Sequence, residues 1–415
     1  MSDKWGADRA QPVAVGPPRR GMSRAERLRQ ARNNRRRRIA RAASLALLIV
    51  VAIAAVFLGS KLWHSFSGGN SNDYAGDGVS DLVIQVHDGD STTAIAKTLH
   101  DHKVVATVKA FVDAAQRNSA MSEIQPGYYK VRTEIPASNA VARLVDPSNR
   151  VGKLTIPEGR QLDDIADVKT NAVTDGIFSL ISKASCVNLD GAKRCVSVDD
   201  LRAAAGTAPV AALAIPQWAA GPVGAMGADH RRIEGLIAPG TWNIDPAAPA
   251  QSILSTLITS SATVYTQGGL LDTAAAMNMS PYQILTVGSL VQREAKPQDF
   301  SKVARVIYNR LAEHRKLEFD STVNYSLDRQ EVATTDADRA KPTPWNSYVR
   351  EGLPQTPICS PGAEALDAAE HPAPGDWLYF VTIDMQGTTL FTRDYNQHLA
   401  NIELARHNGV LDSAR

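Results

Sequence analysis

One glutamate stands where the sequence could build a general acid. Glu294 ends an apolar stripe at helical spacing, which consists of Ile284, Val287, Leu290 and Val291. At about 100° per residue, Glu294 lies under Val287 on the same helical face. A carboxylate at the end of such a stripe is poorly solvated, which raises its pKa and prepares it to donate a proton near neutral pH. The alternative is a solvated glutamate paired with Arg293 or Lys296.

Two helices and a polar loop must position Glu294. Ser280 and Pro281 suit the N-cap and the first position of the helix that carries it. Pro297 ends this helix, and Asp299 can cap a second one, which returns polar side chains toward the first. A loop with further polar groups follows. Polar groups gathered beside a helix pair are what a substrate groove needs.

The polar positions form an ordered series of motifs. They read S-L-V-Q-R-E (289–294), Y-N-R-L (308–311) and L-E-F-D-S-T-V-N-Y (317–325). The series continues through Asn346, Tyr348, G-L-P-Q-T-P-I-C-S-P-G (352–362), Tyr379-Phe380-Val381 and His398. From about residue 82 onward the chain resembles the endolytic lytic transglycosylases of the murein transglycosylase G (YceG-like) family. These are membrane-anchored enzymes that cut peptidoglycan glycan strands.

This resemblance implies that Glu294 is the catalytic acid and base. The same class of enzyme works with one carboxyl group and makes 1,6-anhydro-N-acetylmuramic acid ends without consuming water. The residues expected to position the substrate are Tyr308, Asn309, Asp320, Thr322, Tyr325, Asn346 and Tyr348. The alternative for them is structural hydrogen bonding inside the fold. No cofactor and no metal are expected.

Two other functions stay open at this point. A hydrolytic muramidase would use Asp320, the best second carboxyl, to activate water, because glycoside hydrolases generally need two carboxyl groups. A non-catalytic peptidoglycan-binding scaffold would instead recruit cell-wall synthases or proteins of the division and elongation machinery. The leading prediction is an endolytic transglycosylase that acts on nascent strands and ends their elongation.

The N-terminal region predicts a membrane anchor. Residues 1–41 hold 13 Lys and Arg against 3 acidic residues, whereas the rest of the chain holds 32 against 40. Residues 42–63 contain an apolar run of about 18 residues, the lower end of what a spanning helix needs. The positive-inside rule places the Arg-rich tail in the cytoplasm and the catalytic domain outside a bacterial cell membrane. A cleaved signal peptide is the alternative, but the charged region is long for one.

Beyond the anchor, composition and pattern suggest a linker and two domains. Residues 64–80 are rich in Gly, Ser, Asn and Asp and predict a flexible linker. Residues 81–150 pair strand-like alternation with helical spacing and resemble the LysM-like domain of the family, which implies either glycan binding or simple docking. The same pattern of strand, Gly turn and helix recurs at Ile156–Gly159 and Ile165-Ala166, which suggests a second copy. Residues 151–412 form the expected catalytic domain.

Residues 170–230 are interpreted as an insertion in that domain. They include Cys186 and Cys195, for which an oxidising compartment favours a local disulfide. Cys359 is expected to be a small buried residue. The run G-P-V-G-A-M-G (221–227) is too loosely spaced for a dinucleotide loop and is interpreted as a linker.

The fold expectation is therefore an α+β chain with one N-terminal transmembrane helix, a small LysM-like α/β domain and a mixed α+β catalytic domain. The expected partners are peptidoglycan glycan strands and the cytoplasmic membrane. The acidic body argues against nucleic acid, and the Arg-rich tail is explained by topology and anionic lipid. Metal-protease, phosphate-loop and serine-nucleophile motifs do not occur.

Overall fold

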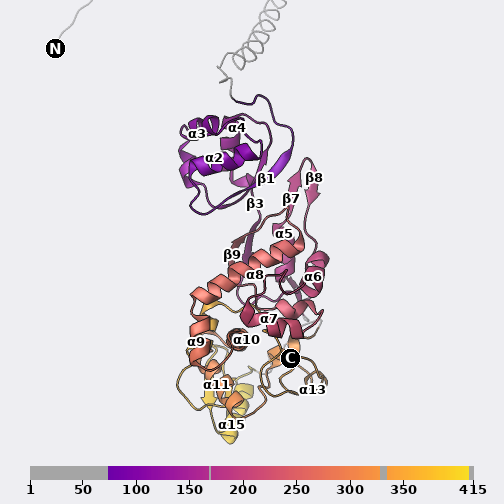
Figure 1. Cartoon of the computed structure of the whole chain (residues 1–415). Coiled ribbons are helices and arrows are strands. Elements are labelled where there is room, and N and C mark those ends of the chain that lie inside the picture. Colours follow the sequence, from indigo (N-terminus) through magenta and orange to yellow (C-terminus); the bar gives the residue numbers. More distant parts are fainter. Residues whose placement is uncertain (1–72, 168–169, 328–333, 411–415) are drawn as a thin grey trace, which may run out of the picture. The chain divides into compact units, whose positions relative to one another are not determined.

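The structure, a computed structural model, describes residues 73–167, 170–327 and 334–410. Its helices are accompanied by small separate sheets (Figure 1). In these ranges the buried apolar side chains form two cores, one drawn from residues 84–144 and one from residues 154–369. The predicted α+β class is confirmed. The predicted Arg-rich tail and transmembrane helix (1–63), and the linker up to residue 72, lie outside the described residues.

The first core is built on a three-stranded antiparallel sheet. The strands, in the order β1-β2-β3, are β1 (Asp81–Val86), β2 (Gly127–Arg132) and β3 (Arg150–Val151). The helices are α2 (Thr92–Asp101), α3 (Val108–Ala115), η1 (Ser119–Glu123), α4 (Ala137–Val145) and η2 (Pro147–Asn149). Ser91 and Thr107 cap α2 and α3 with their side chains. The predicted succession of strand, two helices and strand is confirmed.

The second copy of this unit, predicted from Ile156 onward, is wrong. Strand β4 (Lys153–Ile156) is present and pairs with β9 (Gly240–Asn243). Gly159 has a φ of +71°, close to the +75° of Gly89, so the turn also recurs. However, the expected helix is strand β5 (Ile165–Ala166), paired with β6 (Val173–Thr174). The preceding carboxylates are held by distant groups, because Asp163 binds His230 and Arg202, and these bonds favour an extended chain.

The segment predicted as an insertion, 170–230, is largely structured. It contains α5 (Ile177–Ala184), β7 (Val187–Leu189), β8 (Ala192–Arg194), α6 (Val198–Thr207), α7 (Gln217–Ala225) and the start of η3 (His230–Ile233). A disulfide joins Cys186 to Cys195. The predicted linker at 221–227 is wrong, because most of it lies in α7. Burial of Ala219 and Val223 in the second core overrides the weak helix propensity of its glycines and Pro222.

The second core surrounds α10 (Pro281–Glu294). It is bordered by α8 (Ala250–Gln267), α9 (Leu270–Ala276), η4 (Pro297–Asp299), α11 (Phe300–Ala312) and α14 (Ala363–Glu370). Helices α11 and α14 both pack on α10. Tyr282 and residues 284–291 of α10 are buried, so most of this helix is enclosed by the core, and the residues from Gln292 to Glu294 are partly exposed.

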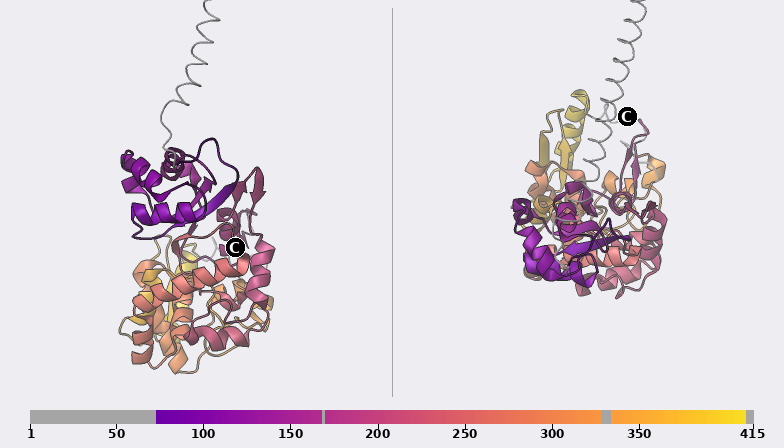
Figure 2. Two further views of the ribbon diagram at one scale, coloured as in Figure 1. Left: turned by 45° about the horizontal axis from the view of Figure 1, so that its top comes forward. Right: turned by 90° about the horizontal axis from the view of Figure 1, so that it is seen from above.

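The remaining elements come from the C-terminal part of the chain. They are α12 (Asp320–Asn324), α13 (Asp336–Arg339), β10 (Tyr379–Thr382), β11 (Thr389–Thr392) and α15 (Tyr395–His407). Strands β10 and β11 form the predicted hairpin, and α15 packs on it. Both views in Figure 2 show this yellow group next to the orange helices. In the described ranges, no helix combines the length and the apolar character needed to cross a membrane.

Candidate active site

Helix α10 delivers Glu294 to the edge of the core. Its start is fixed by a capping box, in which the Gln283 N–H donates to Ser280 Oγ and the Ser280 N–H donates to Gln283 Oε1. Its end is fixed at Ala295, which is extended at φ −137° and ψ 170°. Glu294 therefore occupies the last helical position, where it keeps part of its surface exposed while the residues one turn earlier are fully buried.

The surroundings of Glu294 favour its protonated form. Burial of the carboxyl raises its pKa to about 7, and the negative charge of Asp320 raises it further, whereas Ser321 and Arg293 act in the opposite direction. Both the protonated and the ionised form are therefore accessible near neutral pH. The rise predicted from the apolar stripe is present. A carboxyl in this state can both give and take a proton.

Asp320 has the opposite character. It begins α12, and its Oδ1 accepts hydrogen bonds from Tyr348 Oη at 2.7 Å, Thr334 Oγ1 at 2.7 Å and Arg339 Nε at 3.1 Å. Arg339 also reaches Oδ2 at 3.0 Å. Burial alone would raise the pKa of Asp320, but these donors outweigh it and the pKa is lowered. Asp320 thus stays ionised beside a protonated Glu294.

Ser321 interacts with Glu294 from the position next to Asp320. It follows Asp320 on α12, and its hydroxyl and backbone lower the pKa of Glu294. The hydroxyl oxygen is buried, yet it makes no hydrogen bond of ordinary geometry with any described residue. The site therefore contains a buried donor that is aimed at the Glu294 carboxyl but is not tightly bound to it.

Thr322 and Asn346, two of the predicted substrate-positioning residues, are buried inside the protein. Thr322 is fully buried, and its Oγ1 lies 2.8 Å from Ser347 Oγ. Asn346 Nδ2 donates to the backbone carbonyls of Arg339 and Lys341 at 3.0 Å and 2.7 Å. Both side chains fix the loop that carries Tyr348 and Arg339 to Asp320.

Tyr308 and Asn309 are directed elsewhere. The Tyr308 hydroxyl donates to the carbonyl of Ala369 on α14 at 2.7 Å. Asn309 Nδ2 donates to the carbonyl of Trp377 at 2.9 Å. Tyr308 and Asn309 thus attach α11 to α14 and to the segment before β10. Of the predicted residues, the structure brings Glu294, Asp320 and Tyr348 together.

Glu234 is a second glutamate with a strongly shifted pKa. It follows η3 and is only 1% exposed. Its Oε2 accepts hydrogen bonds from Tyr325 Oη at 2.7 Å and from the Leu162 N–H at 3.1 Å, whereas Oε1 is buried without a partner among the described residues. Burial raises its pKa to about 7, and the charge of Asp163 adds to this rise.

Comparison with known proteins shows which family the chain belongs to. Residues 84–404 match the YceG-like family. The matched range is more than half of the chain and includes Glu294 and Asp320. The chain belongs to the YceG-like family. The ordered motifs from residue 289 onward lie inside the matched region, so the resemblance predicted from them is confirmed.

Similar proteins from other bacteria are named for an activity on murein. This YceG-like chain is similar to the "Endolytic murein transglycosylase" of Bacillus subtilis, with 26% identity over 329 residues, which cover 78% of this chain and 84% of the relative. A protein of the same name from Streptococcus pneumoniae D39 is 23% identical over 77% of this chain, which spans 58% of that longer relative. A crystal structure of a yceG-like protein from Listeria monocytogenes is 24% identical, covers 77% of this chain and 98% of that one, and has a TM-score of 0.46.

Sequence reasoning missed three residues of the YceG-like site. Arg339 stands in a charged stretch that gave no sign of its bond to Asp320. Ser321 lies within a motif but was not singled out. Glu234 was not singled out either, and its apolar neighbours Ile233 and Leu236 are the signal that could have marked it as buried.

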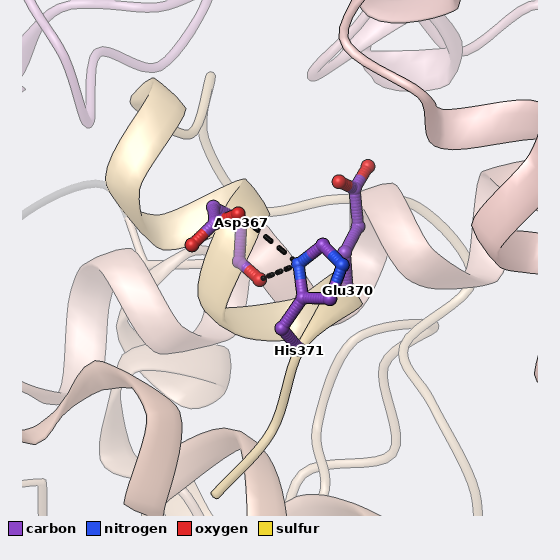
Figure 3. A group of neighbouring side chains, drawn as sticks. All are labelled: Asp367, Glu370 and His371. Carbon is purple, nitrogen blue, oxygen red and sulfur yellow. Dashed lines mark hydrogen bonds and ion pairs between the residues drawn. The ribbon is translucent and has the colours of Figure 1, made fainter.

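One group of side chains in the described ranges has the spacing of a metal site. Figure 3 shows Asp367, Glu370 and His371 at the C-terminal end of α14, where one ligand atom from each lies within 4.8 Å of the others. His371 Nδ1 and Asp367 Oδ1 are 3.1 Å apart, and these two side chains are 66% and 74% exposed. An exposed pair closed by its own hydrogen bond is common at helix ends without an ion, so we assign no metal to it.

Proposed function

We propose that this chain is an endolytic lytic transglycosylase that cleaves the bond between N-acetylmuramic acid and N-acetylglucosamine in peptidoglycan strands. One observation carries this proposal: Glu294, with a pKa of about 7, stands beside an ionised Asp320. Two neighbouring carboxyl groups whose pKa values are pushed apart are the usual sign of an acid with an electrostatic partner. The relatives named as endolytic murein transglycosylases support the choice of substrate.

In this mechanism the Glu294 carboxyl gives its proton to the glycosidic oxygen as the bond to C1 of N-acetylmuramic acid breaks. The departing strand leaves with a new hydroxyl group. The C6 hydroxyl of the same muramic acid attacks C1 and returns its proton to the Glu294 carboxylate. The products are a 1,6-anhydro end and a strand with a free N-acetylglucosamine hydroxyl, and water is not consumed.

The structure suits Glu294 to both steps. A pKa near the working pH lets one carboxyl act as acid and then as base without a large cost in either direction. The fixed negative charge of Asp320 stabilises the positive charge that develops at C1. Tyr348 and Arg339 hold Asp320 in place and keep it ionised.

The bonding of Asp320 favours the transglycosylase over the hydrolytic muramidase. Asp320 Oδ1 already accepts three hydrogen bonds, and Oδ2 receives the Arg339 guanidinium. A base that activates water needs a free lone pair aimed at that water and a pKa high enough to take its proton. Both oxygens of Asp320 are engaged and its pKa is lowered, so it is a weak base and acts here through its charge.

The location of the activity is part of the proposal. The apolar run at 42–63 would anchor the chain in the cytoplasmic membrane, with residues 1–41 in the cytoplasm and residues 81–412 on the outer side. Nascent strands are made at that face, so cleavage there would end strand elongation. We assign residues 81–150 as a LysM-like unit that holds the glycan near Glu294, and we expect any partners to be cell-wall synthases or division proteins.

Product analysis tests the proposed function. The full-length chain in detergent is incubated with uncrosslinked glycan strands, and the product ends are identified by mass spectrometry, with Glu294→Gln run in parallel. Anhydro ends from the parent alone are expected. Reducing ends would instead support the muramidase. An absence of products from both, on strands that another enzyme can cut, would support the scaffold.

A further inference from the structure

Helix α12 is the only element that presents both Asp320 and Ser321 to Glu294, yet it is a single turn of five residues. A helix this short is not stable by itself, so its position depends on what anchors it. Asp320 anchors its start through Arg339 and Tyr348, and Thr322 anchors its middle through Ser347. The third anchor, at its end, is Tyr325.

Tyr325 connects α12 to a distant part of the second core. Its N–H donates to the Ser321 carbonyl at 3.0 Å, and its hydroxyl donates to Glu234 Oε2 at 2.7 Å. The same Glu234 oxygen accepts the Leu162 N–H at 3.1 Å. The carboxyl of Glu234 thus joins three segments, separated by 72 and 91 residues in sequence, at one atom.

The Tyr325 ring is buried in the second core but is not surrounded by packed side chains on every side. One side meets the edge of Trp345, with ring centroids 5.1 Å apart. A cavity of about 280 Å³ is lined by Tyr325 and Glu234, together with polar groups such as Asp163 and Arg231. Where the ring borders this cavity, the bond from its hydroxyl to Glu234 adds to the packing that fixes the end of α12.

We propose that Glu234 is a positioning residue for the reaction at Glu294: through Tyr325 it fixes α12, and α12 holds Ser321 and Asp320 against the Glu294 carboxyl. This inference rests on the proposed function. Glu234 itself is 1% exposed and does not meet the substrate. The neutral carboxyl is sufficient for this role, because its carbonyl oxygen can accept both hydrogen bonds.

The link from Glu234 through Tyr325 to α12 is called the tether below. The pH dependence of the reaction reports on it. The charged and titratable groups that face Glu294 are Arg293 on its own helix, Asp320 on α12 and Tyr348 from the following loop. Ser321 lowers the pKa of Glu294 by hydrogen bonding. When Tyr325 releases the end of α12, Asp320 stays held by Arg339 and Tyr348 at its start, whereas Ser321 moves away. The pKa of Glu294 therefore rises, and the alkaline limb of the rate profile moves to higher pH. General destabilisation lowers the active fraction but leaves the limb in place.

The experiment measures kcat and KM of the full-length chain on uncrosslinked strands between pH 5 and pH 9. Tyr325→Phe and Glu234→Leu are expected to lower kcat about tenfold, as for one buried hydrogen bond. Both should leave KM unchanged and shift the alkaline limb upward by about 0.5 pH unit. Glu234→Gln keeps an oxygen acceptor for both donors and should retain the parent rate and limb.

Two controls separate the tether from loss of stability. Tyr129→Phe removes a buried hydroxyl that donates to a backbone carbonyl at 2.6 Å in the first core, and it should not move the limb. Ser321→Ala should raise the limb as Tyr325→Phe does, and the double variant should shift it little further, because both changes remove the same contact. If Glu234→Leu does not fold, the double variant of Ser321→Ala and Tyr325→Phe still tests the tether.

The outcomes distinguish this inference from the function on which it rests. A parent that makes no anhydro ends overturns both. If the parent makes anhydro ends but the alkaline limb of Tyr325→Phe stays at the parent pH, only the tether is overturned. Equal loss of activity in Glu234→Gln and Glu234→Leu also overturns it, because the acceptor oxygen would then not be what matters.

Discussion

Glu294 and Glu234 share one property and differ in almost every other. Burial raises the pKa of each to about 7. Glu294 keeps an exposed edge, and one buried hydroxyl beside it has no partner of ordinary geometry among the described residues. Glu234 is 1% exposed, and one of its oxygens is occupied by Tyr325 and Leu162. The first can meet a substrate and the second cannot.

The difference shows what a raised pKa does and does not indicate. Desolvation shifts a carboxyl whether it lies in a core or at the edge of a groove. A nearby negative charge does not separate the two either, because Asp320 raises the pKa of Glu294 and Asp163 raises that of Glu234. Access is more informative, since Glu294 keeps part of its surface exposed whereas Glu234 is 1% exposed. A shifted carboxyl with access marks a reactive site.

The largest expected effect separates the two glutamates by activity. Glu294→Gln should lower kcat/KM by about 10³-fold, because a general acid contributes roughly 10²- to 10⁴-fold. Glu234→Gln should leave kcat/KM within about twofold of the parent, since the amide oxygen accepts the same bonds. Initial rates of anhydro-end formation check both. Comparable losses in the two variants would contradict the assignment of the acid to Glu294.

Stability as a function of pH tests the raised pKa of Glu234. A carboxyl whose pKa is near 4.5 when unfolded and about 7 when folded holds its proton longer in the folded state, so stability is complete below pH 4.5 and falls as pH rises to about 7. For Glu234 this amounts to at most about 3 kcal/mol. Urea unfolding at pH 5 and pH 8 should therefore show a smaller loss in Glu234→Gln than in the parent.

The comparison with the parent is what isolates Glu234. Carboxylates with lowered pKa values, such as Asp320 and Asp163, change stability in the opposite direction, and they are present in both proteins. Glu294→Gln should show a comparable effect, because the pKa of Glu294 is raised to the same value. An equal pH dependence in parent and Glu234→Gln would mean that Glu234 is not shifted.

Removing the charge of Asp320 should change both the pKa of Glu294 and the reaction rate. In Asp320→Asn the negative charge that raises the pKa of Glu294 is lost, so the alkaline limb of kcat/KM should move to lower pH. The rate should fall about 30-fold, because the charge that stabilises the developing cation is gone. A pH–rate profile measures both. A limb that stays in place would show that burial alone sets the pKa of Glu294.

What the sequence could predict was local. The ends of α10 follow from Ser280 and Pro297, and the rise in the pKa of Glu294 follows from the apolar stripe that precedes it. The first core was also predictable, since its strands and helices each carry a clear period. These features depend on residues within about one or two helical turns of each other.

What the sequence could not predict depends on distant contacts. Arg339 meets Asp320 across a loop, and Glu234 meets Tyr325 over 91 residues, which no periodicity encodes. The helix at 217–225 forms because the core buries Ala219 and Val223, although glycine and proline argue against it. The strand at Ile165 replaced a predicted helix for the same kind of reason, since Asp163 is held by residues that follow much later.

The smallest effect we predict tests how tightly the Asp320 charge is held. Tyr348→Phe removes one of the three donors to Oδ1 but leaves Arg339 in place, so Asp320 stays ionised. The expected fall in kcat is about fivefold, the worth of one hydrogen bond, with the alkaline limb unchanged because the charge next to Glu294 persists. Thr334→Val removes another donor to the same oxygen and is the matched control. If Tyr348→Phe instead raised KM alone, Tyr348 would bind substrate directly, and the charge of Asp320 beside Glu294 would depend on Arg339 and Thr334.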